Sequence, residues 1–367
     1  MGNCTLACKK FESNSDYEEI KCSSDKDSIE NSQKLHVKAS TNSPHCCNIF
    51  PASHEAKSTI TPFDLQEKFR NNKDVSLKNK SKSSAVTLIT LELQSQLNPS
   101  VKAMYDSLGP FQYPNKDSFE SGKYEPLTES ADLSLYEGEW LNNQRHGKGK
   151  LLWNDGSFFE GIWKNDKANG YGRLIHYDGD VYEGDWKDDK ANGYGTYTHN
   201  GGGRYEGEWI DDKQNGMGKE IWPDGTEYKG MFKNGIKEGK GVFIWNNGCS
   251  YDGNFIENKI DGYGIHKWKD GRQFKGEWKN NKMNGRGVFT WPDGRIYEGN
   301  YKDDKKWGFG VFVWADGKKF SGEWVNGKQS GFGILFLENG EKFEGMWKNG
   351  RPVQNIEGDL RDDKVDE

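Results

Sequence analysis

The segment Tyr136-Glu137-Gly138-Glu139-Trp140 is the first of ten copies of one pattern, aromatic-x-Gly-x-aromatic, which recurs every 23 residues without an insertion. The first aromatic of each copy stands at Tyr136, Phe159, Tyr182, Tyr205, Tyr228, Tyr251, Phe274, Tyr297, Phe320 and Phe343. Eleven residues after it comes Gly-x-Gly, nine times, from Gly147/Gly149 to Gly331/Gly333. Self-similarity at a fixed period of this length indicates a repeat architecture in which each unit packs on its neighbours.

Each unit is expected to form two antiparallel strands. In Tyr297-x-Gly299-x-Tyr301 and Gly287-x-Phe289-x-Trp291, aromatic and Gly positions alternate with polar or β-branched ones, which is the period of a strand. Glycine normally weakens a strand, so glycines at fixed positions indicate the close approach of a ring from a neighbouring hairpin. We expect pairs such as Asp224-Gly225 to form tight type I′ turns, and polar segments such as Lys279–Asn284 to form longer connections.

The composition limits what the chain can be. All fourteen Trp lie at Trp140 or later and only three Gly precede residue 136, so the 367 residues divide into an N-terminal third and a repeat region. A hydrophobic fraction of 32% argues against a thick aliphatic core, and a net charge of −6 argues against a nucleic-acid binder. The six Cys concentrate near the N-terminus, and neither a secretory signal nor a bilayer-spanning run is recognised, which favours a reducing, intracellular compartment.

The residue types that carry chemistry show no catalytic or metal-binding arrangement. The seven His are scattered, and Cys46-Cys47 lacks partners at metal-ligand spacing. Glu137, Glu160 and Glu183 recur because the repeat recurs, and a cross-strand ladder of charges accounts for them better than acid–base catalysis does. We therefore expect no enzyme activity, no cofactor, no metal ion and no nucleic-acid partner.

The repeat resembles the MORN (membrane occupation and recognition nexus) repeat. Tyr-Glu-Gly-x-Trp followed by Gly-x-Gly and Asp-Gly carries this resemblance from residue 136 to about residue 350. It implies an all-β fold, an elongated single-layer antiparallel sheet of about ten 23-residue hairpins over residues 136–353. In enzymes that contain such arrays the catalysis belongs to a separate domain, and neither the N-terminal third nor the acidic tail 354–367 carries a catalytic motif.

Residues 1–84 are rich in Ser, Lys, Asn and Asp and are expected to be disordered. Their beginning predicts lipidation: after removal of Met1, Gly2 is a candidate for myristate, and Cys4 and Cys8 are candidates for palmitate, although Leu6 stands where Ser or Thr is usual. One acyl chain binds a membrane only marginally, so a cysteine or the basic cluster in residues 68–82 would supply the second signal. An ordinary disordered tail is the alternative.

Residues 85–135 are expected to cap the first hairpins. Asn98 followed by Pro99 predicts the start of a short helix, with apolar residues at Val101, Met104, Tyr105 and Leu108. We expect this helix and the preceding segment from residue 86 to pack on the sheet, with a partner-binding amphipathic segment as the alternative. The segment 109–115 mirrors residues 218–224 in its Gly, aromatic and Pro spacing, which predicts a degenerate half-repeat.

Together these features predict a non-enzymatic scaffold that positions partner proteins at the cytoplasmic face of a membrane, the cell cortex or a ciliary or cytoskeletal structure. Membrane contact is expected through the N-terminus, and end-to-end homodimers are expected from exposed sheet ends. An extended peptide or helix of the partner is expected to lie on a groove of aromatics, namely Trp186, Trp209, Phe243, Trp245, Phe289 and Trp291. The alternatives are a carbohydrate- or choline-binding hairpin module and the targeting subunit of a phosphoinositide-linked enzyme complex.

Overall fold

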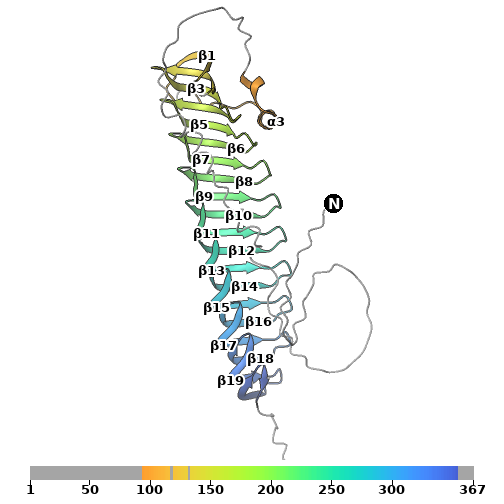
Figure 1. Ribbon diagram of the computed structural model, residues 1–367. Helices are drawn as coiled ribbons and strands as arrows, with labels where there is room; N and C mark the ends of the chain where they lie inside the picture. Colours follow the sequence, from red (N-terminus) through yellow and green to blue (C-terminus); the bar gives the residue numbers. More distant parts are fainter. Residues whose placement is uncertain (1–92, 116–118, 131–132, 354–367) are drawn as a thin grey trace, which may run out of the picture. The chain divides into compact units, whose positions relative to one another are not determined.

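The structure, a computed structural model, describes residues 93–115, 119–130 and 133–353. These residues form one antiparallel sheet of 21 strands in which each strand pairs with the next along the chain (Figure 1). Within the described residues, two helices precede it, the 3-10 helix η1 (Leu93–Gln96) and α3 (Pro99–Leu108). The expected all-β sheet of hairpin repeats is confirmed.

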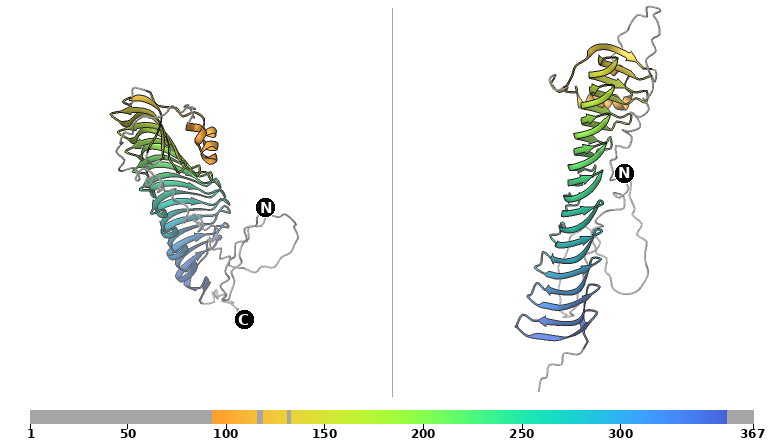
Figure 2. Two further views of the ribbon diagram at one scale, coloured as in Figure 1. Left: turned by 45° about the horizontal axis from the view of Figure 1, so that its top comes forward. Right: turned by 90° about the vertical axis from the view of Figure 1, so that its left-hand side faces the viewer.

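The strands follow the 23-residue period, with a seven-residue and a nine-residue strand in each full repeat. They are β1 Lys123–Glu129, β2 Leu135–Leu141, β3 Gln144–Leu152, β4 Phe158–Lys164, β5 Lys167–Ile175, β6 Val181–Lys187, β7 Lys190–Thr198, β8 Arg204–Ile210, β9 Lys213–Ile221, β10 Glu227–Lys233, β11 Ile236–Ile244, β12 Ser250–Ile256, β13 Lys259–Lys267, β14 Gln273–Lys279, β15 Lys282–Thr290, β16 Ile296–Lys302, β17 Lys305–Val313, β18 Lys319–Val325, β19 Lys328–Phe336, β20 Lys342–Lys348 and β21 Arg351–Pro352. Figure 2 shows that the strands are curved and that successive hairpins rotate, so the sheet twists.

The two kinds of connection are the reverse of the sequence prediction. The tight two-residue turns lie within the polar segments: Asn280 and Asn281, between β14 and β15, have φ of 48° and 65°, as a type I′ turn requires. Asn and Asp adopt this left-handed conformation more readily than other side chains do, so glycine is not needed there. The Asp-Gly pairs lie instead in longer loops. In one of them Trp291 N–H donates to Arg295 O, and Gly294 has a φ of 90°.

The hairpin turns are linked to one another along one edge of the sheet. Where the second turn residue is Asp or Asn, as in most hairpins, its side chain accepts a hydrogen bond from a backbone N–H that lies 21 residues earlier: Oδ1 of Asn281 accepts from Ile260 at 2.7 Å, and Oδ1 of Asp304 accepts from Met283 at 2.8 Å. The N–H of the same turn residue donates back to the carbonyl of the earlier residue. This reciprocal pair of bonds explains why Asp and Asn recur in the turns, and it fixes each hairpin to the one before it.

The two faces of the sheet differ sharply. Along β16 buried and exposed residues alternate strictly, with Tyr297, Gly299 and Tyr301 on the buried face. On that face the rings that open the repeats meet aromatic neighbours edge to face; Tyr297, for example, lies 5.3 Å from Tyr301 of its own repeat and 5.3 Å from Trp324 of the next. We call this side the ring face and the opposite side the outer face. The core on the ring face is therefore a continuous row of rings, with a few aliphatic side chains among them.

In the first nine repeats the ring that opens the repeat lies over a pair of glycines. Gly299 and Gly310 face each other across β16 and β17. A Cβ added to Gly299 would lie 2.5 Å from Oη of Tyr297, and one added to Gly310 would also meet the Tyr297 ring. The buried polar atoms are satisfied locally, since Tyr297 Oη donates to Asn300 O at 3.2 Å and Trp324 Nε1 donates to Gly310 O at 3.1 Å. The predicted close approach of ring and glycine is thus observed, but the ring belongs to the same hairpin as the two glycines and not to a neighbouring hairpin as expected.

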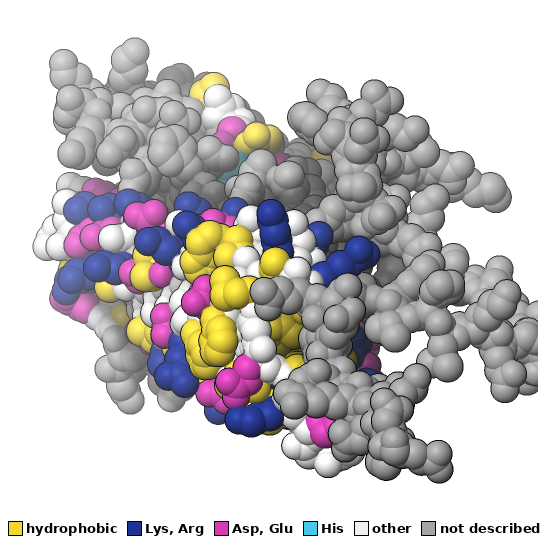
Figure 3. Space-filling model, turned by 90° about the horizontal axis from the view of Figure 1, so that it is seen from below, with side chains coloured by type: hydrophobic (Ala, Val, Ile, Leu, Met, Phe, Trp, Pro, Cys, Tyr) yellow, Lys and Arg dark blue, Asp and Glu magenta, His cyan; other side chains and the backbone are white. Residues whose placement is uncertain are grey.

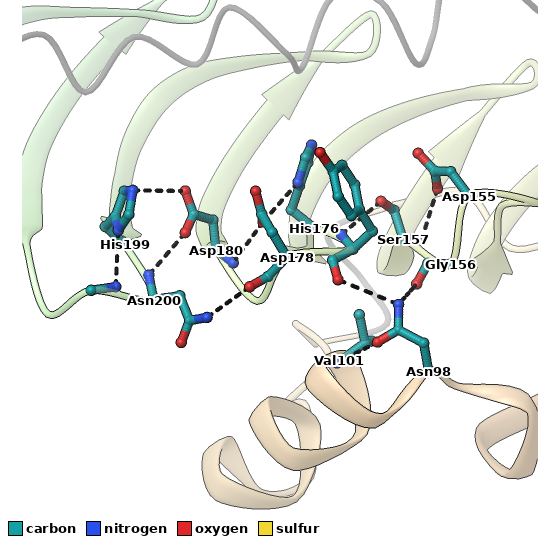
Figure 4. A network of polar contacts seen from close by, with 12 residues as sticks. Asn98, Val101, Asp155, Gly156, Ser157, His176, Asp178, Asp180, His199 and Asn200 are labelled. Carbon is teal, nitrogen blue, oxygen red and sulfur yellow. Dashed lines mark hydrogen bonds and ion pairs between the residues drawn. The ribbon is translucent and has the colours of Figure 1, made fainter.

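The N-terminal segment covers the outer face of the first repeats. The predicted helix is α3, with Asn98 as its N-cap and Pro99 in its first turn. Leu93, Leu97 and Val101 are buried against four outer-face residues of β3 to β6, which are Leu152, Phe158, Ile175 and Val181. Asn98 also donates to the carbonyls of Gly156 and Tyr177 in two successive loops (Figure 4).

The predicted half-repeat takes a different form. Residues 109–115 form no strand; they lie across the outer face, where Phe111 stacks on Tyr171 of β5 at 5.8 Å. The strand that covers the first edge of the array is β1, which pairs with β2 through a register shift between Glu125 and Thr128. Residues 109–115 therefore share the Gly, aromatic and Pro spacing of residues 218–224, but they form an extended segment that carries a ring and no part of a hairpin.

Gly299→Ala tests the packing of a ring over paired glycines. The new methyl group would overlap Tyr297 and the backbone of β17, and overpacking of this kind costs about 1–3 kcal/mol. We expect a lower midpoint in urea unfolding monitored by Trp fluorescence. Gly345→Ala is the matched control, since Gly345 holds the same place in the last repeat and a Cβ there meets none of the described atoms within 4 Å. Equal effects of the two substitutions would contradict the packing.

Candidate functional site

The six aromatics predicted to line a partner groove belong to the ring core. Trp186, Trp209, Phe243, Trp245 and Phe289 are buried, and Trp291 is half-buried and packs against them. They are brought together as parts of one row, in which Trp186 and Trp209 donate from Nε1 to glycine carbonyls. Neighbouring rings cover most of the surface of these side chains, because the strands are curved and bring the rings of the row into contact. Binding of a partner to them stays a prediction. The lipidation candidates Gly2, Cys4 and Cys8 lie outside the described residues.

Several ionisable groups are enclosed by the rings. The amine of Lys306 lies 4.2 to 5.4 Å from the centroids of four rings, which belong to Trp291, Tyr297, Phe312 and Trp324. Desolvation lowers the pKa of Lys306 to about 7, although the residue as a whole keeps some solvent exposure. In the equivalent position of other repeats stand Ala191, Gln214 and Met283, so this site accepts a side chain of any polarity that fits among the rings.

The other enclosed charges have partners of opposite sign or are neutral. Lys237 pairs with Glu220 at 2.7 Å, and burial raises the pKa of the Glu220 carboxyl. Glu160 lies 3.4 Å from Arg173, and burial raises its pKa to about 7 against the opposing effect of that guanidinium. His266 is packed between tryptophans, and burial lowers its pKa to about 4, so the imidazole is neutral at physiological pH.

The arrangement of these groups argues for a structural role. Perturbed pKa values indicate a catalytic site when the groups face a cleft, and here each group faces rings or its own ion pair. No group of three or more His, Cys, Asp or Glu within residues 93–115, 119–130 and 133–353 could hold a metal ion. Neither described helix is long and apolar enough to cross a bilayer.

One cavity of about 350 Å³ lies between the N-terminal segment and β3 to β6. Pro114, Phe119 and Glu120 line one side of it, and His146 and Asp185 are among the residues on the sheet side. His146 Nε2 lies 3.5 Å from the exposed Glu120 carboxylate. This wall contains one imidazole and carboxylates but no Ser or Cys nucleophile, so we interpret it as the seam where the covering segment meets the sheet.

The outer face carries a second periodic feature, which the sequence analysis missed. The middle residue of each Gly-x-Gly points away from the rings, and we call these residues the outer row: Lys148, Tyr171, Tyr194, Met217, Lys240, Tyr263, Arg286, Phe309 and Phe332. Five of them are large apolar side chains with about half of their surface exposed, namely Tyr194 55%, Met217 48%, Tyr263 51%, Phe309 60% and Phe332 52%. The signal was present in the sequence as a large residue between two glycines on the face opposite the rings.

The apolar character of the outer face increases toward the C-terminal end. Beside Phe309 and Phe332, β17 and β19 place Val311 and Ile334 on this face, and Met346 of β20 is opposite Phe332. The view from this end shows hydrophobic side chains gathered among Lys, Arg, Asp and Glu (Figure 3). Repeated exposed apolar side chains of this kind mark interaction surfaces in soluble proteins.

At the N-terminal end the outer row is already covered by part of the chain. Phe111 stacks on Tyr171 with an interplanar angle of 12°, and the Arg173 guanidinium lies 5.4 Å from the Phe111 ring. Arg173 also donates from Nη1 to Gly109 O at 2.9 Å. Farther along the same segment, the Lys148 amine lies 5.1 Å from the Tyr113 ring. An extended segment with flanking prolines thus crosses from β5 to β3 at the first rings of the row.

Comparisons with known proteins agree with the repeat. The MORN repeat family model matches residues 136–158, 159–181, 182–204, 205–227, 228–250, 251–271, 274–294, 297–319, 320–342 and 343–353. No curated protein matches the chain.

Similar solved structures give only distant matches. The TCP10 domain of CPAP from Danio rerio is 11% identical and has a TM-score of 0.32, with 60% of this chain and 99% of that chain covered. The G-box domain of the microcephaly protein CPAP is 13% identical and has a TM-score of 0.29, with 55% and 100% covered. The TCP domain of SAS-4 from Drosophila melanogaster, in complex with a proline-rich motif of Ana2, is 13% identical and has a TM-score of 0.17, with 66% and 99% covered. At these scores the similarities carry no argument about function.

Lys306→Met tests the interpretation that enclosing the amine among the rings costs stability. The pKa of Lys306 is near 7 in the folded state and 10.5 in the unfolded state, so the amine binds its proton more tightly in the unfolded chain. The resulting loss of folding stability is complete below about pH 7 and disappears as the pH rises to 10.5. Removing the amine should therefore raise the free energy of unfolding at pH 6.5 by on the order of 1 kcal/mol, after allowance for partial exposure, and by less at pH 9.5. Urea titrations at both pH values measure this.

The neighbouring exposed Lys305 provides the control for that measurement. Lys305→Met should leave stability and its dependence on pH unchanged. If Lys306→Met lowered stability at pH 6.5, the amine would be a favourable partner of the four rings and the interpretation would fail.

Proposed function

The chain belongs to the MORN repeat family, and from this premise we propose that it is a non-enzymatic scaffold that holds partner proteins at the cytoplasmic face of a membrane or at the adjacent cytoskeleton. The observation that carries the proposal is the outer row. It exposes large apolar side chains at one position of the repeat, along a sheet whose core is satisfied without them. A fold with a self-sufficient ring core does not need these side chains for stability, and partner binding accounts for them.

The absence of enzymatic activity is part of the proposal. Lys306 faces rings and Lys237 faces its ion-pair partner Glu220, and a catalytic group must instead reach a substrate. The repeats supply a long, regular surface, which suits the simultaneous or stepwise binding of extended partners more than it suits an enclosed reaction.

The membrane component of the proposal rests on the sequence of the N-terminus. Myristate on Gly2, palmitate on Cys4 or Cys8, and the basic cluster in residues 68–82 would together supply the two signals that stable anchoring requires. The repeats have a nearly balanced charge, with 51 basic and 57 acidic residues in the whole chain, and this gives little electrostatic reason for the array itself to bind anionic lipid.

Cell fractionation of the Gly2→Ala, Cys4→Ser double variant tests the anchor. We expect the full-length double variant to move from the membrane fraction to the soluble fraction, because loss of myristate and of the Cys4 site leaves only Cys8 and the weaker basic cluster. Cys22→Ser is the matched control, since it removes a nearby thiol outside the predicted signal, and it should fractionate like the wild type.

Proximity labelling from the C-terminus of the same proteins tests the scaffold. The wild type should label a defined set of proteins at the membrane, and the double variant should lose the membrane-bound members of that set. Unchanged membrane recovery of the double variant would overturn the anchor, and a labelled set no different from that of a soluble control protein would overturn the scaffold.

A further inference from the structure

We propose that the outer row between Tyr263 and Phe332 binds a proline-rich peptide segment that carries Arg or Lys and runs along the sheet, at right angles to the strands, as a polyproline II helix. This inference rests on the scaffold function proposed above and names the chemistry of the partner. Four observations support it: the spacing of the row, the carboxylates beside Tyr263 and Phe309, the internal segment that already covers Tyr171, and the continuity of that contact with the open part of the row.

The spacing of the repeat selects the conformation of the partner. Successive members of the outer row are separated by two strands, which is roughly 9.6 Å in the hydrogen-bonding direction. A polyproline II helix returns to the same side every three residues, after about 9.3 Å. An α-helix returns after a heptad, about 10.5 Å, and drifts out of step by about 1 Å per repeat. A β-strand presents the same side after about 6.6 or 13 Å and matches neither. Only the polyproline II period stays in step over several repeats.

The chemistry of the row fits prolines and cations. Three aromatics of the uncovered row stand directly opposite a carboxylate on the neighbouring strand: Tyr194 faces Glu208, Tyr263 faces Glu277 and Phe309 faces Glu323. Exposed rings take the flat face of proline, as in other domains that recognise polyproline II segments. The adjacent exposed carboxylates of Glu277 and Glu323 would pair with basic side chains at the intervening positions.

The covered end of the row shows how such a segment is held. Pro110 and Pro114 flank Phe111, whose ring stacks on Tyr171, and Asp185 stands opposite Tyr171 as Glu277 stands opposite Tyr263. The backbone of this segment is fixed by a hydrogen bond from Arg173 to Gly109 O. The same surface continues from Tyr194 onward with no described segment on it. The proposed partner would extend this contact along the face.

The region from Tyr263 to Phe332 is the best developed part of the row. It spans three hairpin steps, or roughly 29 Å, which corresponds to about nine residues of polyproline II. Phe309 and Phe332 are adjacent members, and Met346 extends the apolar surface beyond them. Arg286 lies between Tyr263 and Phe309 and is paired with Glu298 at 3.3 Å, so its charge is partly neutralised.

Fluorescence anisotropy with the full-length protein and labelled peptides tests the proposal. The probe is a peptide of four Pro-Pro-Arg units. One control peptide, of four Pro-Pro-Glu units, keeps the polyproline II conformation and reverses the charge; another, of four Gly-Ser-Arg units, keeps the charge and loses the conformation. We expect saturable binding of the Pro-Pro-Arg peptide, with at least tenfold weaker binding of both controls.

Variants of the row locate the binding. Tyr263→Ala with Phe309→Ala should weaken binding of the Pro-Pro-Arg peptide at least tenfold, and Glu277→Gln with Glu323→Gln should weaken it several-fold and reduce its dependence on salt. These side chains are exposed, so the variants should keep the wild-type unfolding midpoint. Tyr177→Ala removes an equally exposed ring from a loop outside the row and is the matched control, with unchanged binding expected.

Two results would overturn the proposal: no saturable binding of the Pro-Pro-Arg peptide up to about 1 mM, a limit that corresponds to about −4 kcal/mol, or binding that the ring variants leave unchanged. Proximity labelling with the Tyr263→Ala, Phe309→Ala variant distinguishes failure of the proline-rich partner assignment from failure of the scaffold function. If the variant loses partners in cells while the wild type binds no proline-rich peptide, the scaffold function holds and the assigned partner chemistry falls.

Discussion

The packing of one ring over two facing glycines is the contact on which the rest of the structure depends. Tyr297 occupies the space that side chains at Gly299 and Gly310 would need, and it meets aromatic residues of its own and the next repeat edge to face. Because the ring needs both the glycine of its own strand and the glycine of the following strand, the register within each hairpin is fixed. The contact of Tyr297 with Trp324 and the hydrogen bond from Trp324 Nε1 to Gly310 O then join each hairpin to the next at a constant distance. The constant 23-residue period over ten repeats is the consequence in the sequence.

This contact also gives the two faces of the sheet different roles. The rings pack against one another, and groups such as Tyr297 Oη and Trp324 Nε1 donate to nearby carbonyls, so these rings have little left to offer a ligand. It even encloses a cation, Lys306, and an ion pair, Lys237 with Glu220, without a substrate-facing cleft. The outer face is free of this constraint. Its residues vary from repeat to repeat, and that variation is where specificity for a partner can be encoded.

Much of the fold could be predicted from the sequence because its determinants are local and periodic. Alternation identified the strands, Asn98-Pro99 identified the start of α3, and the fixed glycines indicated the close approach of rings. The turns were misassigned because Asn280-Asn281 adopts positive φ without glycine, which the usual preference for Asn-Gly and Asp-Gly obscures. The ring surface was expected to be open because strand curvature, which buries Trp209 and Phe289, is a property of the assembled sheet. The place of Phe111 on Tyr171 depends on a contact 60 residues apart in sequence, beyond the reach of any local pattern.

The central claim is that one face is a closed core of rings and the other is the surface available to partners. Hydroxyl-radical footprinting of the full-length protein, read by mass spectrometry at single residues, tests it most directly, because Tyr194 and Tyr205 lie in adjacent strands with exposures of 55% and 0%. The account predicts fast oxidation of Tyr194, Tyr263, Phe309 and Phe332 and protection of Tyr205, Tyr251 and Tyr297. Oxidation of the second group at the rate of the first would show that the ring face is open and would contradict the account.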